Sequence, residues 1–176
     1  MCIRDSGITS FDHADIYGGY TTEADFGNAF KKSSIDREKV QYITKCGIQM
    51  PCEARPLNVK YYDYSSSHIR LSVENSLRNL KTEYIDLLLL HRPSPLMEAS
   101  EICDVFYKLR EEGKVNQLGV SNFTTSQIKL LQKDEEINSE INDIIDQKLS
   151  YLVENKIEKI LDEKIPKLLK NYFDTK

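Results

Sequence analysis

The chain has 176 residues and a formal net charge of −4 at pH 7, and 40% of its residues are hydrophobic. This is the composition of an ordinary globular protein that can bury a core, and the length favours a single folded domain. The mild acidity argues against nucleic acid as a partner, and no apolar run approaches the roughly 18 residues of a membrane-spanning helix.

The four cysteines lie at positions 2, 46, 52 and 103, and none of them forms a CxxC pair. Scattered thiols in a chain of this length argue against a disulfide framework. The first residues of the chain carry no apolar signal-peptide core. The sequence therefore predicts a cytoplasmic protein.

Residues 8–133 alternate between short apolar runs and amphipathic runs. Ile8–Phe11 is expected to form a short strand, and Thr22–Lys32 is expected to form a helix with Thr22 as its N-cap. Val40–Thr44 is rich in β-branched and aromatic residues and predicts a second strand. A loop that contains prolines follows this strand.

The same alternation continues after the loop. The serines at 65–67 lead into a helix in which Glu74 and Arg78 are spaced to form a stabilising pair. Tyr84–Leu90 predicts an apolar strand that is interrupted only by Asp86. The expected apolar face of the helix consists of Ile69, Val73, Leu77 and Leu80.

The last unit of this region has the same form. Ile102–Arg110 predicts a helix with Gly113 near its C-terminal end, and Val115–Val120 predicts a strand. Thr124 or Thr125 is expected to cap a further helix.

Strand and helix thus alternate four times, which favours a parallel sheet covered by helices. A doubly wound sheet and a (β/α) barrel both satisfy this pattern, although a complete barrel needs eight units and about 250 residues. Residues 134–176 differ, because they are highly charged and their apolar residues follow helical spacing. This segment is predicted to be an amphipathic helical tail.

Polar residues follow each predicted strand at the point where the strand ends. In parallel α/β folds these ends meet at one edge, where catalytic groups collect. The residues are Asp12 and Tyr17 after the first strand, Lys45 at the second, His91 after the third, and Ser121 and Asn122 after the fourth.

Such a set of side chains suits carbonyl reduction. A tyrosine is a weak acid with an ordinary pKa of about 10, and a neighbouring ammonium group favours its phenolate. We therefore expect Tyr17 to donate a proton to a substrate carbonyl oxygen, with Lys45 beside it and a carboxylate holding Lys45. His91 would donate a hydrogen bond to the same oxygen, and the hydride would come from a bound nicotinamide.

The sequence also resembles a known family at four places. The segment Gly7–Gly18 resembles the aldo-keto reductase signature around its active Asp and Tyr, and Ile43–Lys45 resembles the strand that carries the catalytic Lys. Asp86–Pro93 resembles the strand of the catalytic His, and Gly113–Phe123 resembles the strand whose Ser and Asn hold the nicotinamide carboxamide. The resemblance covers residues 7–133 and is strongest to the bacterial general reductases of the family.

This resemblance implies that residues 7–133 have an α/β fold that is a partial (β/α)8 TIM barrel, about strands 2–5. The helical tail predicted from spacing for residues 134–176 follows it. The resemblance also implies NADPH as the cofactor and reduction of aldehydes and ketones to alcohols by hydride transfer. The implied catalytic residues are Asp12, Tyr17, Lys45 and His91. The implied cofactor-binding residues are Asp12, Ser121 and Asn122.

Several of these residues also have a purely structural interpretation. Asp12 could be a turn carboxylate, and Ser121 with Asn122 could cap the next helix. His13 and Asp15 lack a third ligand at a useful spacing, so no metal site is expected. His68 is interpreted as a surface residue at a helix start, and Cys46 as a packing thiol.

The resemblance leaves some segments of the family without a counterpart. The first hairpin and strands six to eight, which in the family contribute to the cofactor cradle, are not identifiable in the sequence. We therefore expect this chain to bind NADPH weakly or not at all. Without bound NADPH, the chain is expected to be inactive. The alternative is a non-catalytic, reductase-like binding or oligomeric subunit; the sequence does not fix the oligomeric state.

Overall fold

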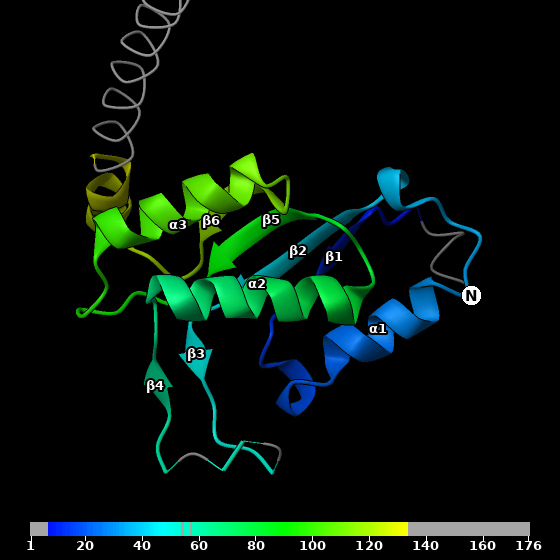
Figure 1. Cartoon of the computed structure of the whole chain (residues 1–176), viewed down its shortest axis with the longest axis horizontal. Coiled ribbons are helices and arrows are strands. Elements are labelled where there is room, and N and C mark those ends of the chain that lie inside the picture. The colour runs from blue at the N-terminus through cyan, green and yellow to red at the C-terminus, as the bar shows by residue number, and fades with distance from the viewer. Residues whose placement is uncertain (1–6, 54, 57, 134–176) are drawn as a thin grey trace, which may run out of the picture. The chain divides into compact units, whose positions relative to one another are not determined.

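The computed structural model describes residues 7–53, 55–56 and 58–133. Its centre is a sheet of parallel strands in the order β1-β2-β5-β6 (Figure 1). The strands are β1 (Ser10–Asp12), β2 (Gln41–Cys46), β5 (Ile85–Leu90) and β6 (Val115–Val120). Because all of them run in one direction, their carboxyl ends lie at the same edge.

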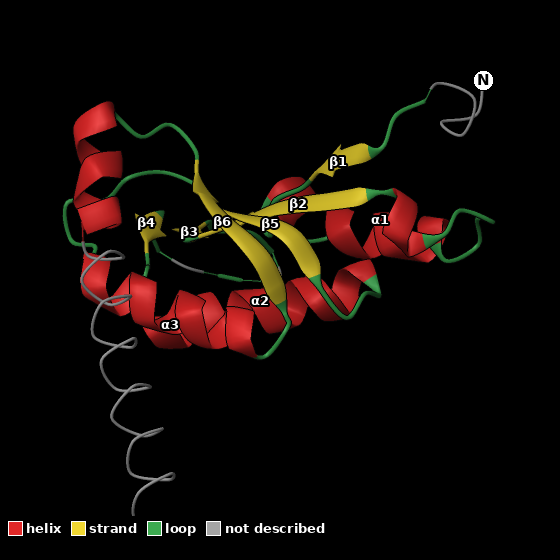
Figure 2. Ribbon diagram, turned by 90° about the horizontal axis from the view of Figure 1, so that it is seen from above, coloured by secondary structure: helices red, strands yellow, loops and turns green. Residues whose placement is uncertain are grey.

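Helices connect these strands, as expected for βαβ units. Figure 2 shows α2 and α3 on the same side of the sheet, and α1 packs beside α2. The main helices are α1 (Thr22–Phe30), α2 (Ser66–Leu80) and α3 (Ala99–Glu111), and residues 125–133 are also helical. The short elements are η2 (Tyr17–Gly19), η3 (Arg37–Lys39), and a small hairpin of β3 (Ile48–Gln49) and β4 (Tyr61–Tyr62).

The core lies between the sheet and the helices. Leu88 and Leu90 of β5 are fully buried on the helix-covered side, whereas Leu87 and Leu89, which alternate with them, are only half-buried. The predicted apolar face of α2 is confirmed, because its four residues are all buried. The larger core cluster includes Ile69, Val73, Leu77, Ile102, Val105, Phe106 and Leu109.

The helix ends differ in part from expectation. Ser65 caps α2, since its side chain accepts a hydrogen bond from the backbone N–H of His68. The predicted N-cap of α1 is wrong: the capping position is Thr21, whose hydroxyl donates to the carbonyl of Gly18 at 3.0 Å instead. The helix also ends at Phe30, before Lys32.

The last described helix begins with reciprocal capping bonds. The Thr124 hydroxyl accepts from the backbone N–H of Gln127 at 3.4 Å, and the Gln127 side chain accepts from the backbone N–H of Thr124 at 2.9 Å. This arrangement is a capping box, which satisfies two backbone donors together. It decides between the two expected caps in favour of Thr124.

The expected pair of Glu74 and Arg78 on α2 is not formed. Glu74 accepts instead from Lys114 at 2.6 Å, and Arg78 donates to Asn75 at 3.0 Å. A contact from Lys114, the residue before β6, thus replaces the contact within the helix.

The described part of the chain is a partial barrel of the predicted α/β class, with four parallel strands and covering helices. The predicted helical tail, residues 134–176, lies outside the described residues. None of the helices in the described ranges is long and apolar enough to cross a membrane.

Candidate active site

Lys45 stands at the centre of the residues that gather at the carboxyl edge of the sheet. It is only 6% exposed, and its ammonium group donates to both carboxylate oxygens of Asp12 at 2.7 Å. It also donates to the carbonyl of His13 at 2.8 Å and to the phenol oxygen of Tyr17 at 3.2 Å. These acceptors compensate the charge of a buried ammonium group.

Tyr17 reaches Lys45 because the chain turns sharply after β1. The backbone N–H of Asp15 donates to the carbonyl of Lys45 at 3.1 Å, which holds the segment after β1 against the end of β2. Gly18 then adopts a φ of +60°, and a Cβ there would lie 2.5 Å from the Thr22 hydroxyl. The turn therefore needs glycine, and it leaves Tyr17 about one-third exposed.

His91 follows β5 and lies beside Tyr17. The two rings are 6.0 Å apart between centroids and meet nearly edge to face, at 77°. Burial lowers the pKa of His91 to about 4, and the charges of Lys45, Arg92 and Lys60 act in the same direction, against Asp12. The imidazole is therefore neutral near pH 7.

Ser121 and Asn122 lie at the end of the neighbouring strand, β6. The backbone N–H of Ser121 donates to the carbonyl of Leu90 at 2.9 Å. Asn122 adopts a left-handed φ of 64°, and its side-chain amide donates to the Ser121 hydroxyl at 2.8 Å and to the carbonyl of His91 at 3.4 Å. These two residues are thus directly adjacent to the tetrad, which we define as Asp12, Tyr17, Lys45 and His91. They do not cap the next helix, whose cap is Thr124.

The structure also shows supporting residues that the sequence patterns did not reveal. Glu23 of α1 is buried and accepts from the hydroxyls of Thr44 at 2.6 Å and Ser76 at 3.1 Å. It thereby ties α1 and α2 to β2 at the residue before Lys45. A glutamate in the first turn of a helix gives no local signal of such a role, since its partners lie 21 and 53 residues away.

The interpretation of His68 as a surface residue is wrong. His68 is buried, and its ring lies 2.9 Å from the amide nitrogen of Gln49, which belongs to β3. Cys46 is fully buried in the core, and burial raises the pKa of its thiol. His13 packs on Phe26 with ring centroids 4.4 Å apart, and no three His, Cys, Asp or Glu residues in the described part are grouped to hold a metal ion.

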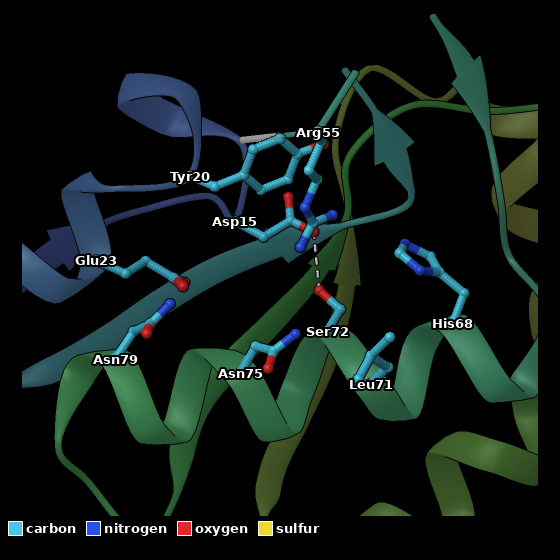
Figure 3. Close-up of a pocket in the computed structure, with 9 residues that line it drawn as sticks. All are labelled: Asp15, Tyr20, Glu23, Arg55, His68, Leu71, Ser72, Asn75 and Asn79. Carbon is cyan, nitrogen blue, oxygen red and sulfur yellow. Dashed lines mark hydrogen bonds between the residues drawn. The ribbon is translucent and has the colours of Figure 1, made fainter. Parts of the chain in front are cut away.

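A separate polar pocket of about 230 Å³ lies between α2 and the loops after β1 and β3 (Figure 3). No tetrad residue lines it. Asp15 points into it and accepts from the Ser72 hydroxyl at 2.8 Å, while its other carboxylate oxygen is buried without a hydrogen-bond partner in the described residues. The lining residues are Asp15, Tyr20, Glu23, Arg55, His68, Leu71, Ser72, Asn75 and Asn79.

Comparison with known sequences identifies the relatives of this chain. The sequence model of the Aldo/keto reductase family matches residues 2–174. The chain is 52% identical over 132 residues to the uncharacterized oxidoreductase YcsN of Bacillus subtilis, a match that covers 74% of this chain and 44% of that protein. It is 47% identical over 127 residues to a 6-dehydroglucose reductase of Agrobacterium fabrum, covering 72% and 43%. The chain thus spans less than half the length of these curated relatives.

Solved structures give the same result. A glycerol dehydrogenase of Gluconobacter oxydans matches with a TM-score of 0.66 and 33% identity, over 74% of this chain and 39% of that one. An aldo-keto reductase of Klebsiella pneumoniae, solved in complex with NADPH, matches with a TM-score of 0.59 and 28% identity, over 73% and 39%. The chain therefore belongs to the aldo/keto reductase family, and its parallel strands are part of that family's barrel.

Proposed function

We propose that this protein reduces aldehydes and ketones to alcohols with NADPH, and that the tetrad performs the proton transfer. The observation that carries the proposal is the position of the Lys45 ammonium group, bonded to both oxygens of Asp12 and 3.2 Å from the Tyr17 phenol oxygen. An ammonium group beside a phenol oxygen favours the phenolate, so this position of Lys45 suits Tyr17 to donate a proton.

Tyr17 acts as the acid in this proposal. Its proton moves from the phenol oxygen to the carbonyl oxygen of the substrate as that oxygen gains negative charge. The Lys45 ammonium group stabilises the phenolate that remains. The ammonium group is buried, and opposite charges attract more strongly where water does not screen them. Asp12 holds the ammonium group in place through two hydrogen bonds.

His91 acts as a hydrogen-bond donor to the same substrate oxygen. Because its pKa is about 4, the ring carries no extra proton to transfer at neutral pH. A neutral imidazole still has one N–H group, which can orient the carbonyl and stabilise the developing oxyanion. This leaves Tyr17 as the proton donor.

Asp12, Ser121 and Asn122 are proposed to contact the nicotinamide cofactor. A hydroxyl and a side-chain amide offer the donors and acceptors that a carboxamide requires, and both lie at the strand end next to His91. When bound, NADPH supplies the hydride. The Klebsiella pneumoniae neighbour solved with NADPH supports this choice of cofactor.

The substrate is proposed to be a polyhydroxylated carbonyl compound. This rests on the names of two similar proteins, a 6-dehydroglucose reductase and a glycerol dehydrogenase. A sugar aldehyde is therefore expected to be reduced in preference to an apolar aldehyde of similar size.

Tyr17→Phe tests the proposal. The variant removes only the hydroxyl, so NADPH-dependent reduction by the 176-residue chain, followed at high cofactor concentration by NADPH absorbance, should fall by roughly 10²–10⁴-fold. Tyr42→Phe is the matched control, because that hydroxyl is buried without a hydrogen-bond partner in the described residues. Turnover that is unchanged in Tyr17→Phe would contradict the proposal and favour the non-catalytic subunit.

A further inference from the structure

Tyr64, in the loop before α2, binds the backbone of the residue that follows His91. Its side chain is buried, with 5% of the residue exposed. Its hydroxyl accepts a hydrogen bond from the backbone N–H of Arg92 at 3.0 Å and donates one to the backbone carbonyl of the same residue. Both backbone polar groups of Arg92 are therefore satisfied by one side-chain hydroxyl, just beyond the last residue of β5.

The Tyr64 ring is held equally firmly on its other side. It lies against Gly47, where a Cβ would be 2.0 Å from the ring, and Gly47 has a φ of +101° that favours glycine. The backbone N–H of Asp63 also donates to the carbonyl of Gly47 at 2.9 Å. Tyr64 thus packs on the chain two residues after Lys45.

These contacts connect the ends of two strands that carry tetrad residues. Gly47 follows β2, which carries Lys45, and Arg92 follows His91 at the end of β5. Beyond the paired residues of β2 and β5, one more backbone hydrogen bond joins these two strands in the described residues. The His91 N–H donates it to the Cys46 carbonyl at 3.0 Å. Past that bond, Tyr64 supplies the connection.

We propose that Tyr64 is a positioning residue for His91: by fixing the Arg92 backbone against the end of β2, it sets where the imidazole lies relative to Tyr17 and Lys45. The proposal rests on the function proposed above, because only a substrate-orienting His91 needs such precision. Among the described residues, no hydrogen bond or ring contact joins Tyr64 to a tetrad side chain, and its two hydrogen bonds go to the Arg92 backbone, so its effect passes through the backbone.

Tyr42 shows that a buried tyrosine in this chain does not always use its hydroxyl. Tyr42 is fully buried, yet its hydroxyl has no hydrogen-bond partner in the described residues. If Tyr64 served only to fill space, Phe would replace it as readily as it would replace Tyr42. The two bonds to Arg92 predict that it does not.

Tyr64→Phe and Tyr42→Phe in the full chain test this, with NMR of the imidazole groups as the readout. The chain has three histidines, so each ring can be assigned. In Tyr64→Phe we expect the His91 imidazole signals to move and its pKa to rise from about 4 towards 6.5, because a loosened strand end admits water. The His13 signals should stay in place, and Tyr42→Phe should leave His91 unchanged.

Amide hydrogen exchange in the unsubstituted chain provides a second measurement that does not depend on the variant folding. Arg92 should be protected although it lies beyond the strand ladder, and Tyr64→Phe should remove that protection while Leu88 and Leu90 keep theirs. Exchange of Arg92 at the rate of an exposed amide, or unchanged His91 signals in Tyr64→Phe, would overturn the proposal. Neither measurement uses turnover, so its failure is distinguishable from failure of the proposed function.

Discussion

Burial shifts the pKa of two side chains near the turn after β1 in opposite directions. It lowers the pKa of His91 to about 4, because an imidazolium loses its hydration, and it raises the pKa of Asp15 to about 7, because a carboxylate loses its hydration. His91 is therefore neutral at neutral pH, while Asp15 changes its charge there. The Ser72 hydroxyl and Arg55 oppose the shift of Asp15, and Glu23 adds to it.

Asp15→Asn is expected to remove a pH dependence of stability. Between pH 3.8 and about 7, the folded chain keeps a proton on Asp15 that the unfolded chain releases, so the free energy of unfolding falls as the pH rises through this window. Above about pH 7 the free energy of unfolding has lost the whole contribution of this proton. The variant should therefore be more stable than the unsubstituted chain at mildly alkaline pH, by about 1–4 kcal/mol.

Urea unfolding at mildly acidic and mildly alkaline pH measures this effect. Asp25→Asn is the control, because Asp25 lies on the exposed side of α1 and has no part in the pocket. A difference between the two pH values that is as large in Asp15→Asn as in the unsubstituted chain would show that Asp15 is not the group responsible.

Among the secondary-structure elements, η3 has an anchoring role that its length does not indicate. Its Arg37 guanidinium lies between the rings of Tyr42 and Tyr84, at 3.8 and 4.2 Å from their centroids. It donates to Asp86 at 2.6 Å and to the backbone carbonyls of Val40 and Tyr84 at 2.8 and 3.0 Å. Arg37 thus joins the beginnings of β2 and β5, at the edge opposite the tetrad.

Arg37→Lys is expected to destabilise the chain by about 1–3 kcal/mol although the charge is kept. An ammonium group cannot reproduce the planar set of donors or the stacking between two rings, so partly buried acceptors would lose their partners. Thermal or urea unfolding measures the change. Lys39→Arg, an exposed substitution in the same element, should leave stability unchanged, and equal effects of the two substitutions would refute the anchoring role.

At the scale of the whole molecule, the number of strands and the number of residues that can contact the cofactor decide how tightly NADPH binds. Within the described residues, β1 and β6 each pair with a strand on one side only, and Leu87 and Leu89 on the face away from α2 are half-buried. The proposed nicotinamide contacts in this part are limited to Asp12, Ser121 and Asn122. Because binding costs NADPH its translational and rotational freedom, so few contacts leave little net free energy of binding.

The dissociation constant of NADPH from the 176-residue chain is therefore expected to lie above the micromolar range. Titration followed by NADPH fluorescence should show no saturation in that range. Asn122→Ala should weaken any residual binding, whereas Asn116→Ala, at an exposed position earlier in β6, should not. A micromolar dissociation constant would show that residues beyond these three hold the cofactor.

Local patterns were sufficient for most of the fold and for the members of the tetrad. The strand at Val115–Val120 was predicted with its bounds, and the buried face of α2 followed from helical spacing, because both depend on neighbouring residues. The tetrad residues can be expected to lie together from the sequence, because each lies at or after the end of a strand and parallel strands bring such positions to one edge.

The contacts that hold the site could be seen only in three dimensions. Tyr64 meets Arg92 from 28 residues away, Glu23 meets Ser76 from 53 residues away, and Arg37 meets Asp86 from 49 residues away. The burial of His68 gives no signal in the sequence, because its contact with Gln49 of β3 comes from 19 residues away. Sequence spacing reports which face of an element is apolar, whereas the partner of a buried polar group depends on how distant segments pack.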